Sequence, residues 1–310
     1  MKNIYKSLFV VNPISANGRT PKTWGNIERY LKQRGLKFDV RYTDMPREAI
    51  TITREALQGD YQHILSVGGD GTLNEVVNGF FNNDGSKIKE DAYLSLIPMG
   101  TGGDFARMLK SSSHPQKIYE ILAQGKEKKI DIVRSTFTGW SGQVESRYYL
   151  NVADVGVGSE TVYHVNRNSK VFRGFLSFLV FGIYSILTYD NKLLNVKVDD
   201  RKVYVGKSSM VVISNGCYFG GGMKIAPYAS LDDGLLDIII VKDLSKLGLL
   251  KHVKGIYSGQ HLNDPNIKFM NGKKTEILSD QKVYLEIDGE TPGTGNLEFQ
   301  IMPQEIKLLI

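Results

Sequence analysis

The sequence predicts two domains: an α/β domain with a mostly parallel sheet over residues 1–134, and a β-rich, sandwich-like domain over residues 135–299. In the first part of the chain, strand patterns alternate with helical patterns, which is typical of a doubly wound parallel sheet. In the second part, strands follow one another with turns between them. The length of 310 residues also suits two domains. A last apolar strand within residues 300–310 can return to the first domain.

Each expected element of the first domain has a sequence signal. Short apolar runs predict strands, and apolar residues three or four positions apart predict helices. The expected strands cover residues 7–11, 36–42, 61–67 and 92–97, and the expected helices cover residues 24–31, 46–57, 73–80 and 118–122. Ligands bind at the carboxyl ends of the strands in such sheets. The loops at residues 12–18, 68–72 and 98–107 are therefore the candidate ligand-binding loops.

The central motif is Gly68-Gly69-Asp70-Gly71-Thr72-Leu73-Asn74-Glu75, which follows a strand and opens a helix. Its glycines let backbone N–H groups approach an anion closely, and the helix N-terminus adds partial positive charge. The motif therefore predicts a phosphate site. The alternative is a tight strand-to-helix turn in which Asp70 and Thr72 only cap the helix.

Asp70 indicates a particular kind of phosphate chemistry. A carboxylate repels a phosphate unless a cation or a proton transfer lies between them, so Asp70 suggests a magnesium-bound nucleotide. The loop at residues 98–107 also combines glycines with an acid, Asp104, which can cap the following helix. Two glycine loops with one Asp each, on neighbouring strand ends, favour ligand binding over a simple turn.

The second domain is expected to contain strands interrupted by one helical segment. The strands are predicted at residues 147–155, 195–205, 209–214, 235–241 and 283–287. The helix is predicted at residues 171–189, and its uncharged part is short and polar for a membrane span. Two interpretations stay open. The helix is either buried against the sheet, or lies at a membrane interface, flanked by Arg167, Lys170 and Arg173.

An acidic turn in the second domain is a candidate metal site. Residues 230–237 contain Asp232-Asp233-Gly234, which is a strong turn signal. Hard cations bind carboxylates together with loop carbonyls and water, and such a turn can offer both. The alternative is an ordinary hairpin turn.

A second acidic stretch ends the strand at residues 283–287. Strict alternation directs Val283, Leu285 and Ile287 to the core and places Tyr284, Glu286 and Asp288 together on the other face. Carboxylates at this strand end can accept a hydroxyl proton or organise a metal ion. Alternatively, they are simply solvated.

Composition narrows the class of protein. The 39 Lys and Arg exceed the 33 Asp and Glu, which favours an anionic partner such as a nucleotide or an anionic membrane. No signature indicates nucleic acid. Cys217 is the only cysteine, which excludes an intrachain disulfide or a thiolate metal cluster, and the histidines lack zinc-site spacing. With no signal-peptide pattern, we expect a cytoplasmic protein.

The chain resembles the diacylglycerol kinase catalytic family of soluble lipid kinases, which includes bacterial diacylglycerol kinases and the sphingosine and ceramide kinases. The resemblance covers nearly the whole chain and rests on motifs in the expected order. These motifs are Asn12-Pro13, residues 68–75, residues 100–107, residues 220–237 and Asp288-Gly289-Glu290.

The resemblance implies a nucleotide-binding domain, a β-sandwich lipid domain and an active site in the cleft between them. It implies ATP as the phosphoryl donor, with contacts from Asn12, Pro13, Ile14, Ser15, Ala16, Thr43, Gly69, Asp70, Gly71, Thr72, Leu73, Asn74, Glu75 and Thr101. It also implies Mg²⁺ at Asp233 and at the backbone oxygens of Ser230 and Leu235. The proton acceptor would be Glu290 or Asp288, with Glu290 preferred, while Asp70 would organise a catalytic Mg²⁺ or orient the acceptor.

The expected reaction is transfer of the γ-phosphoryl group of ATP to the hydroxyl of diacylglycerol or a similar lipid. The enzyme would be peripherally associated with the membrane surface, and a homodimer is compatible with this role. One alternative is a soluble-acceptor kinase of the NAD kinase type; another is a catalytically idle nucleotide-binding or membrane-docking protein. Gly103 stands where the family usually carries Asn, so that amide is missing. Retention of every candidate acid favours an active kinase.

Overall fold

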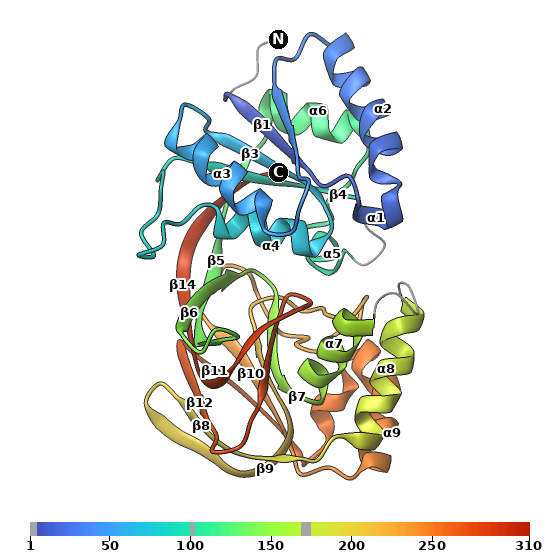
Figure 1. Cartoon of the computed structure of the whole chain (residues 1–310), viewed down its shortest axis with the longest axis vertical. Helices are drawn as coiled ribbons and strands as arrows, with labels where there is room; N and C mark the ends of the chain where they lie inside the picture. The colour runs from blue at the N-terminus through green and yellow to red at the C-terminus, as the bar shows by residue number, and fades with distance from the viewer. Residues whose placement is uncertain (1–4, 100–102, 169–174) are drawn as a thin grey trace. The chain divides into compact units, whose positions relative to one another are not determined.

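The computed structural model describes residues 5–99, 103–168 and 175–310, and the chain divides into two compact units (Figure 1). The first unit contains Met1–Ile130 and Gln304–Ile310, and the second contains Asp131–Pro303. These bounds lie a few residues from those expected from the sequence. The predicted order of an α/β domain followed by a β-rich domain is confirmed.

A sheet of parallel strand pairs forms the centre of the first unit. Its strands are β1 (Ser7–Val11), β2 (Asp39–Tyr42), β3 (His63–Gly68), β4 (Tyr93–Pro98) and the C-terminal end of β14 (Glu290–Leu309). Their order is β14-β4-β3-β1-β2, and each of these pairs is parallel. Parallel neighbours need a crossover, and helices separate β1 to β4 along the chain.

Helices pack on this sheet and bury its strands, which is why the strands are apolar. They are α1 (Ser15–Gly18), α2 (Thr20–Gln33), α3 (Glu48–Gln58), α4 (Asp70–Asn78), α5 (Asp104–Leu109) and α6 (Pro115–Gln124). From α2, Trp24, Ile27 and Leu31 pack against Phe9 of β1 and Leu65 of β3. Both strands are fully buried, which accounts for their continuous apolar runs.

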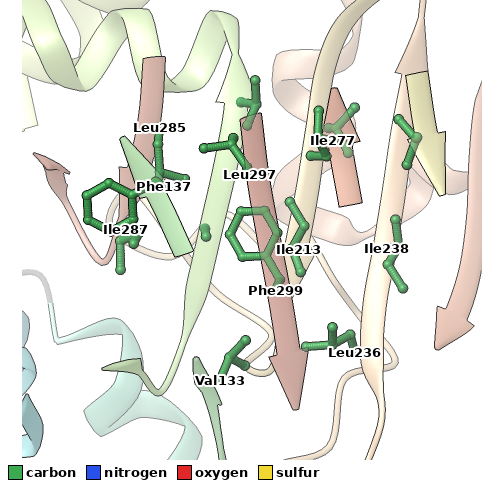
Figure 2. Close-up of a cluster of buried hydrophobic side chains, with 14 of the residues drawn as sticks. Val133, Phe137, Ile213, Leu236, Ile238, Ile277, Leu285, Ile287, Leu297 and Phe299 are labelled. Carbon is green, nitrogen blue, oxygen red and sulfur yellow. The ribbon is translucent and has the colours of Figure 1, made fainter. Parts of the chain in front are cut away.

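Antiparallel pairing distinguishes the second unit. Its strands are β5 (Glu127–Gly139), β6 (Val144–Tyr149), β7 (Val152–Gly156), β8 (Lys192–Val198), β9 (Arg201–Ser214), β10 (Leu236–Lys242), β11 (Ile267–Gly272), β12 (Lys274–Leu278), β13 (Tyr284–Ile287) and β14. Pairing runs in the order β11-β10-β9-β7-β13-β14, and the register of each described pair here is antiparallel. Figure 2 shows the shared core, in which Phe137, Ile213 and Phe299 are fully buried.

Two expected strands differ from the observed ones. The strand predicted at residues 147–155 is interrupted, because the carbonyl of Asn151 accepts hydrogen bonds from Asn215 and Gly216 between β6 and β7. The strand predicted at residues 195–205 is instead the hairpin of β8 and β9, since Asp199 and Asp200 both adopt left-handed conformations. Two consecutive left-handed residues are the geometry of a tight hairpin turn, which Asp tolerates.

The prediction of a single helix in the second domain is wrong. The structure contains α7 (Val157–Asn168), α8 (Phe175–Thr188) and α9 (Lys246–Ser258) (Figure 1). It also contains a short 3₁₀ helix at Gln260–Asn263. Of the predicted helix 171–189, residues 171–174 lie outside the described residues. No helix among the described residues is both long and apolar enough to span a bilayer.

Candidate functional site

Loops of the first unit begin at one edge of the parallel sheet. β1 and β3 pair in register at Val11 and Val67, and β3 and β4 pair at Gly68 and Pro98. The loops that follow these strands therefore start beside one another, as parallel strand order predicts. Asn12 begins the first loop, and the glycine turn after Gly68 forms the second.

The glycine turn combines one tightly packed glycine with two open ones. A Cβ atom on Gly68 would lie 2.4 Å from Thr72 Oγ1, whereas a Cβ on Gly69 or Gly71 would meet no atom within 4 Å. Gly68 thus lets α4 begin close to β3, and the other two leave open space over the turn. α4 has nine residues, and the N–H groups of its first turn have no partner within the helix. This arrangement can bind a phosphate.

Asn12 connects the first loop to the glycine turn. Its Nδ2 donates to Thr72 Oγ1 at 3.0 Å, and its backbone N–H donates to Val67 O at 3.0 Å. Its Oδ1 accepts from the N–H of Ile14 at 3.1 Å, and its carbonyl accepts from Ser15 Oγ at 2.8 Å. The Asn12 side chain therefore fixes the two loops relative to each other.

The other candidate residues of this edge are partly open. Pro13 and Ser15 are half-buried, and the side chain of Ile14 is exposed. Ala16 has a left-handed backbone with φ of 54°, so α1 is not a regular helix. Thr43, which follows β2, is buried and donates its N–H to β1 at the same edge. Thr101 lies outside the described residues.

Asp70 joins the glycine turn to α5. Its Oδ2 accepts from the N–H of Asp104 at 3.0 Å, and Asp104 Oδ1 accepts from Arg107 Nη1 at 2.7 Å. Burial raises the pKa of Asp70, opposed by the N–H groups of Asp104 and Phe105 and by the Arg107 charge. A half-buried carboxylate beside a helix N-terminus is suited to hold a cation or a proton.

The conformation of Gly103 explains how the second glycine loop tolerates the missing Asn. Gly103 has a left-handed backbone, with φ of 35°, immediately before α5. Glycine adopts this conformation readily, and Asn adopts it more easily than most residues. Gly103 therefore keeps the turn while it lacks the amide.

Three predicted nucleotide-binding residues have structural side chains. Leu73 is buried in the core, and Asn74 Oδ1 accepts from Asn78 Nδ2 at 3.2 Å. The Glu75 carboxylate accepts from the N–H groups of Arg47 and Ala49, at 2.9 and 3.2 Å, where α3 begins. Glu75 thus stabilises the N-terminus of α3 in the manner of a helix cap.

In the second unit, buried Asp131 holds the acidic turn. Its Oδ2 accepts from the N–H of Gly234 at 2.7 Å, and its own N–H donates to Leu231 O at 2.6 Å. Within the turn, Asp233 Oδ1 accepts from the N–H of Leu235 at 3.0 Å. Sequence reasoning missed Asp131, because a strand pattern does not show that a single acid is buried.

The acidic turn carries oxygen atoms of the kind that hard cations bind. The predicted ligands are the Asp233 carboxylate and the carbonyls of Ser230 and Leu235, and Mg²⁺ prefers such oxygen ligands. In the part of the chain that the structure describes, no group of three or more His, Cys, Asp or Glu side chains could hold a metal ion. A cation here would therefore depend on carbonyls, water or phosphate oxygens besides Asp233.

The two candidate proton acceptors in the turn after β13, Asp288 and Glu290, have different hydrogen-bond partners. Asp288 Oδ1 accepts from the N–H of Val152 at 3.1 Å, and Asp288 Oδ2 accepts from the N–H of Leu150 at 3.5 Å. The Glu290 side chain is 43% exposed, and its Oε2 accepts from Arg147 Nη1 at 2.7 Å. The Glu290 carboxylate is therefore partly exposed and held by an arginine, while both carboxylate oxygens of Asp288 hold backbone N–H groups.

Glu286 is buried, which corrects the expectation that it could be solvated with Tyr284 and Asp288. It pairs with Asp154 across β13 and β7, and α7 contacts both strands. Glu286 Oε1 accepts from the N–H of Gly289 at 2.5 Å, next to Glu290. The pattern of alternation assigned the correct face, but it did not show that a helix covers that face.

Asp154 and Glu286 form a buried acid pair. Burial raises the pKa of Asp154 to about 7, and burial together with the Asp154 charge raises the pKa of Glu286 well above its ordinary value. Glu286 is therefore the protonated member near neutral pH. Asp154 Oδ1 accepts from the N–H of Ser159 at 2.7 Å, so the pair connects α7 to the Gly289 turn.

Comparison with known protein families matches both units. Residues 6–135 match the diacylglycerol kinase catalytic domain, and residues 151–310 match the YegS C-terminal NAD kinase beta sandwich-like domain. The chain belongs to the diacylglycerol kinase catalytic family. Membership of this family supports kinase activity.

Curated relatives of this family span almost the whole chain. Diacylglycerol kinase from Staphylococcus carnosus is 28% identical over 305 residues, covering 98% of this chain and 94% of the relative. Diacylglycerol kinase from Bacillus subtilis is 26% identical over 306 residues, covering 98% of this chain and 96% of the relative. The family assignment thus covers both units.

Solved structures share the fold. A diacylglycerol kinase from Bacillus anthracis strain Sterne aligns with a TM-score of 0.69 at 19% identity, covering 99% of this chain and 97% of that one. An NAD kinase from Archaeoglobus fulgidus in complex with ATP aligns with a TM-score of 0.54 at 14% identity, covering 98% and 93%. At these identities the likeness shows the fold alone.

Proposed function

We propose that this member of the diacylglycerol kinase catalytic family transfers the γ-phosphoryl group of ATP to the hydroxyl of diacylglycerol or a similar lipid. The observation that carries the proposal is the glycine turn. Gly69 and Gly71 have open space above them, at the N-terminus of α4, within the matched catalytic domain. Such a turn suits the phosphates of a nucleotide.

In this proposal the first unit binds ATP. The loop from Asn12 to Ala16, Thr43, the turn from Gly69 to Glu75, and Thr101 contact the nucleotide. Leu73, Asn74 and Glu75 contribute through their backbone atoms, because their side chains are engaged elsewhere. Phosphoryl transfer has a loose transition state, so alignment by backbone N–H groups and neutralisation of charge provide most of the catalysis.

The proposed proton acceptor is Glu290, which is accessible and held in place by Arg147. As general base, Glu290 would take the hydroxyl proton of the acceptor during transfer. Asp288 would keep the turn in shape through the N–H groups of Leu150 and Val152. Asp70 would orient the acceptor or a cation from its half-buried position beside Asp104.

Mg²⁺ is the proposed metal ion. Asp233, with the backbone oxygens of Ser230 and Leu235, would hold a structural ion, and Asp70 would organise a second one with the nucleotide. When bound, the ion supplies neutralisation of negative charge. Asp131 would preserve the shape of the acidic turn by accepting the N–H of Gly234.

We further propose that the protein works in the cytoplasm and associates peripherally with the membrane that contains its acceptor. The excess of basic residues suits an anionic membrane surface. A lipid acceptor also requires the enzyme to reach an interface.

A radiolabelled-ATP assay tests the proposed function. The acceptors are diacylglycerol, sphingosine and ceramide in mixed micelles with Mg²⁺, together with NAD in solution. We expect labelled phospholipid from diacylglycerol or a related lipid and none from NAD. Labelled NADP in the absence of lipid product would overturn the lipid assignment and support a soluble-acceptor kinase. ATP binding without transfer to any acceptor would support an idle protein.

A further inference from the structure

The exposed face of α8 is apolar over two helical turns. Val180, Ile183, Tyr184 and Leu187 are exposed by 38, 44, 49 and 51%. Their spacing of three, one and three residues places them on one side of a helix. α8 contains no Asp, Glu, Lys or Arg along its length (Phe175–Thr188), so no charge solvates this face.

The opposite side of α8 is packed, so the stripe is not the surface of a detached helix. Ser185 is buried, and Ile186 packs against the core beneath the helices. The ring of Phe181 stacks with that of His164 of α7, with 6.4 Å between the ring centroids. α8 also contacts α9 (Figure 1). The helix therefore has one side fixed to its own unit and one apolar side facing solvent.

Basic side chains lie beside this stripe. Lys246, at the start of α9, donates to the carbonyl of Leu187, and Lys192 lies 5.6 Å from the ring of Tyr189 just after α8. The exposed positions of α9 include Leu247 and the cations Lys251 and Lys254, and α9 contains no acid. An apolar stripe with basic neighbours is complementary to an anionic lipid surface.

We propose that α8, with the start of α9, is the surface that docks on an anionic membrane, and that α8 lies in the plane of the interface. We call Val180, Ile183, Tyr184, Leu187 and Leu247 the docking stripe. At 14 residues, α8 is about 21 Å long, which is shorter than a hydrocarbon core of about 30 Å. This inference deepens the proposed function and rests on it for the role of docking, which is to reach a lipid acceptor.

A bilayer is a better occupant of this stripe than a second copy of the chain. The cations around the stripe would repel the same cations in a symmetric partner. Anionic lipid headgroups would instead pair with them, while Ile183 and Leu187 insert among the acyl chains. The sequence left open whether this helix is buried or interfacial, and the exposed stripe favours the interfacial interpretation.

Vesicle co-sedimentation tests the stripe. The variant Ile183→Glu/Leu187→Glu is compared with wild type and with Val144→Glu/Val205→Glu, which changes two exposed apolar residues on β6 and β9. On vesicles with phosphatidylglycerol, we expect the stripe variant to bind at least about tenfold more weakly, since apolar insertion is lost and like charges are added. The strand variant should bind like wild type.

A site-specific label tests the contact directly. Cys217 is buried, so Leu187→Cys and Val205→Cys each introduce one accessible thiol for an environment-sensitive fluorophore. The two positions are matched, at 51 and 56% exposure. We expect a blue shift on vesicle addition only at position 187. Equal shifts, or a shift at position 205 alone, would overturn the proposed surface.

Two controls separate this inference from the proposed function. Circular dichroism and melting temperature should match wild type in the stripe variant, because Glu is a good helix former at exposed positions. With a water-soluble short-chain diacylglycerol, this variant should retain wild-type activity, since docking is no longer needed.

The outcomes distinguish the docking surface from the proposed function. Loss of vesicle binding with activity on the short-chain substrate intact supports the docking surface, whereas unchanged vesicle binding overturns it. A wild-type dimer that the substitutions split, with no vesicle binding, would identify a second copy as the occupant. Failure of the wild-type protein and of every variant to phosphorylate any lipid would count against the proposed function alone.

Discussion

The two units build their candidate catalytic groups in opposite ways. In the first unit, the main feature is backbone: Gly69 and Gly71 leave open space at the N-terminus of α4. In the second unit, exposed groups are held from beneath by buried acids, with Asp131 under the acidic turn and Glu286 under the turn that carries Glu290. A glycine-rich turn can be recognised in a sequence, but a buried acid that supports an exposed turn cannot.

Asp70 is the exception in the first unit, since its half-buried side chain is an acid within the glycine turn. We predict that Asp70→Asn lowers kcat by about 10³-fold or more, because charge stabilisation in the transition state is lost. The fold should survive, because an amide oxygen can still accept the N–H of Asp104. Initial rates with radiolabelled ATP and a thermal melt measure the two effects.

Asp60→Asn is the matched control, because Asp60 is exposed and pairs with Lys6 at the surface. It should leave both the rate and the melting temperature unchanged. Wild-type turnover in Asp70→Asn would remove Asp70 from the catalytic machinery and reduce its role to helix capping.

Glu286 allows the same comparison in the second unit. We predict that Glu286→Leu lowers the free energy of unfolding by about 1–3 kcal/mol, because buried Asp154 and the N–H of Gly289 each lose a hydrogen-bond partner. Glu286→Gln should stay near wild type, because the amide can donate to Asp154 and accept from the N–H of Gly289. Urea unfolding at pH 6 measures the free energy of unfolding of both variants. Equal loss in the two variants would show that the pair does not share a proton.

The pair also sets a dependence of stability on pH. The pKa of Asp154 is raised to about 7, so the folded protein binds a proton that the unfolded chain releases near pH 4. The free energy of unfolding should therefore fall as the pH rises from about 4 through 7, and fall further as Glu286 ionises. Glu286→Gln should weaken this dependence at the alkaline end. A wild-type stability that rises over the same range would contradict the assignment of the shared proton.

The elements that the sequence predicted best are those with a local physical signal. The strands at residues 7–11 and 61–67 are continuous apolar runs, and both appear as β1 and β3 within a residue or two. The turn at Gly68 could be predicted from its glycines, and the structure shows why a glycine is needed there: a Cβ atom on Gly68 would lie 2.4 Å from Thr72 Oγ1. In each case the residues themselves carry the reason for the structure.

The features that the sequence did not show depend on contacts between distant residues. The burial of Glu286 requires α7 to lie over β13, and the role of Asp131 requires Gly234 to lie beside it. α9 was missed although Ser245 caps its start and Gly259 ends it in a left-handed conformation, because internal glycines weaken its pattern. The cap signals would have found α9, whereas no local signal would have found the buried acid pair.

A pair of glycine substitutions separates packing from ligand binding within the first unit. We predict that Gly68→Ala lowers the free energy of unfolding by about 1–3 kcal/mol, because the new methyl group overlaps Thr72. Gly69→Ala should change stability little, since its Cβ would meet no atom within 4 Å, yet it should weaken ATP binding by occupying the open space. Urea unfolding and calorimetric titration with Mg-ATP measure the two quantities. If Gly69→Ala binds ATP like wild type, the open turn is not where the phosphates lie, and the comparison between a backbone-built first unit and an acid-supported second unit loses its functional meaning.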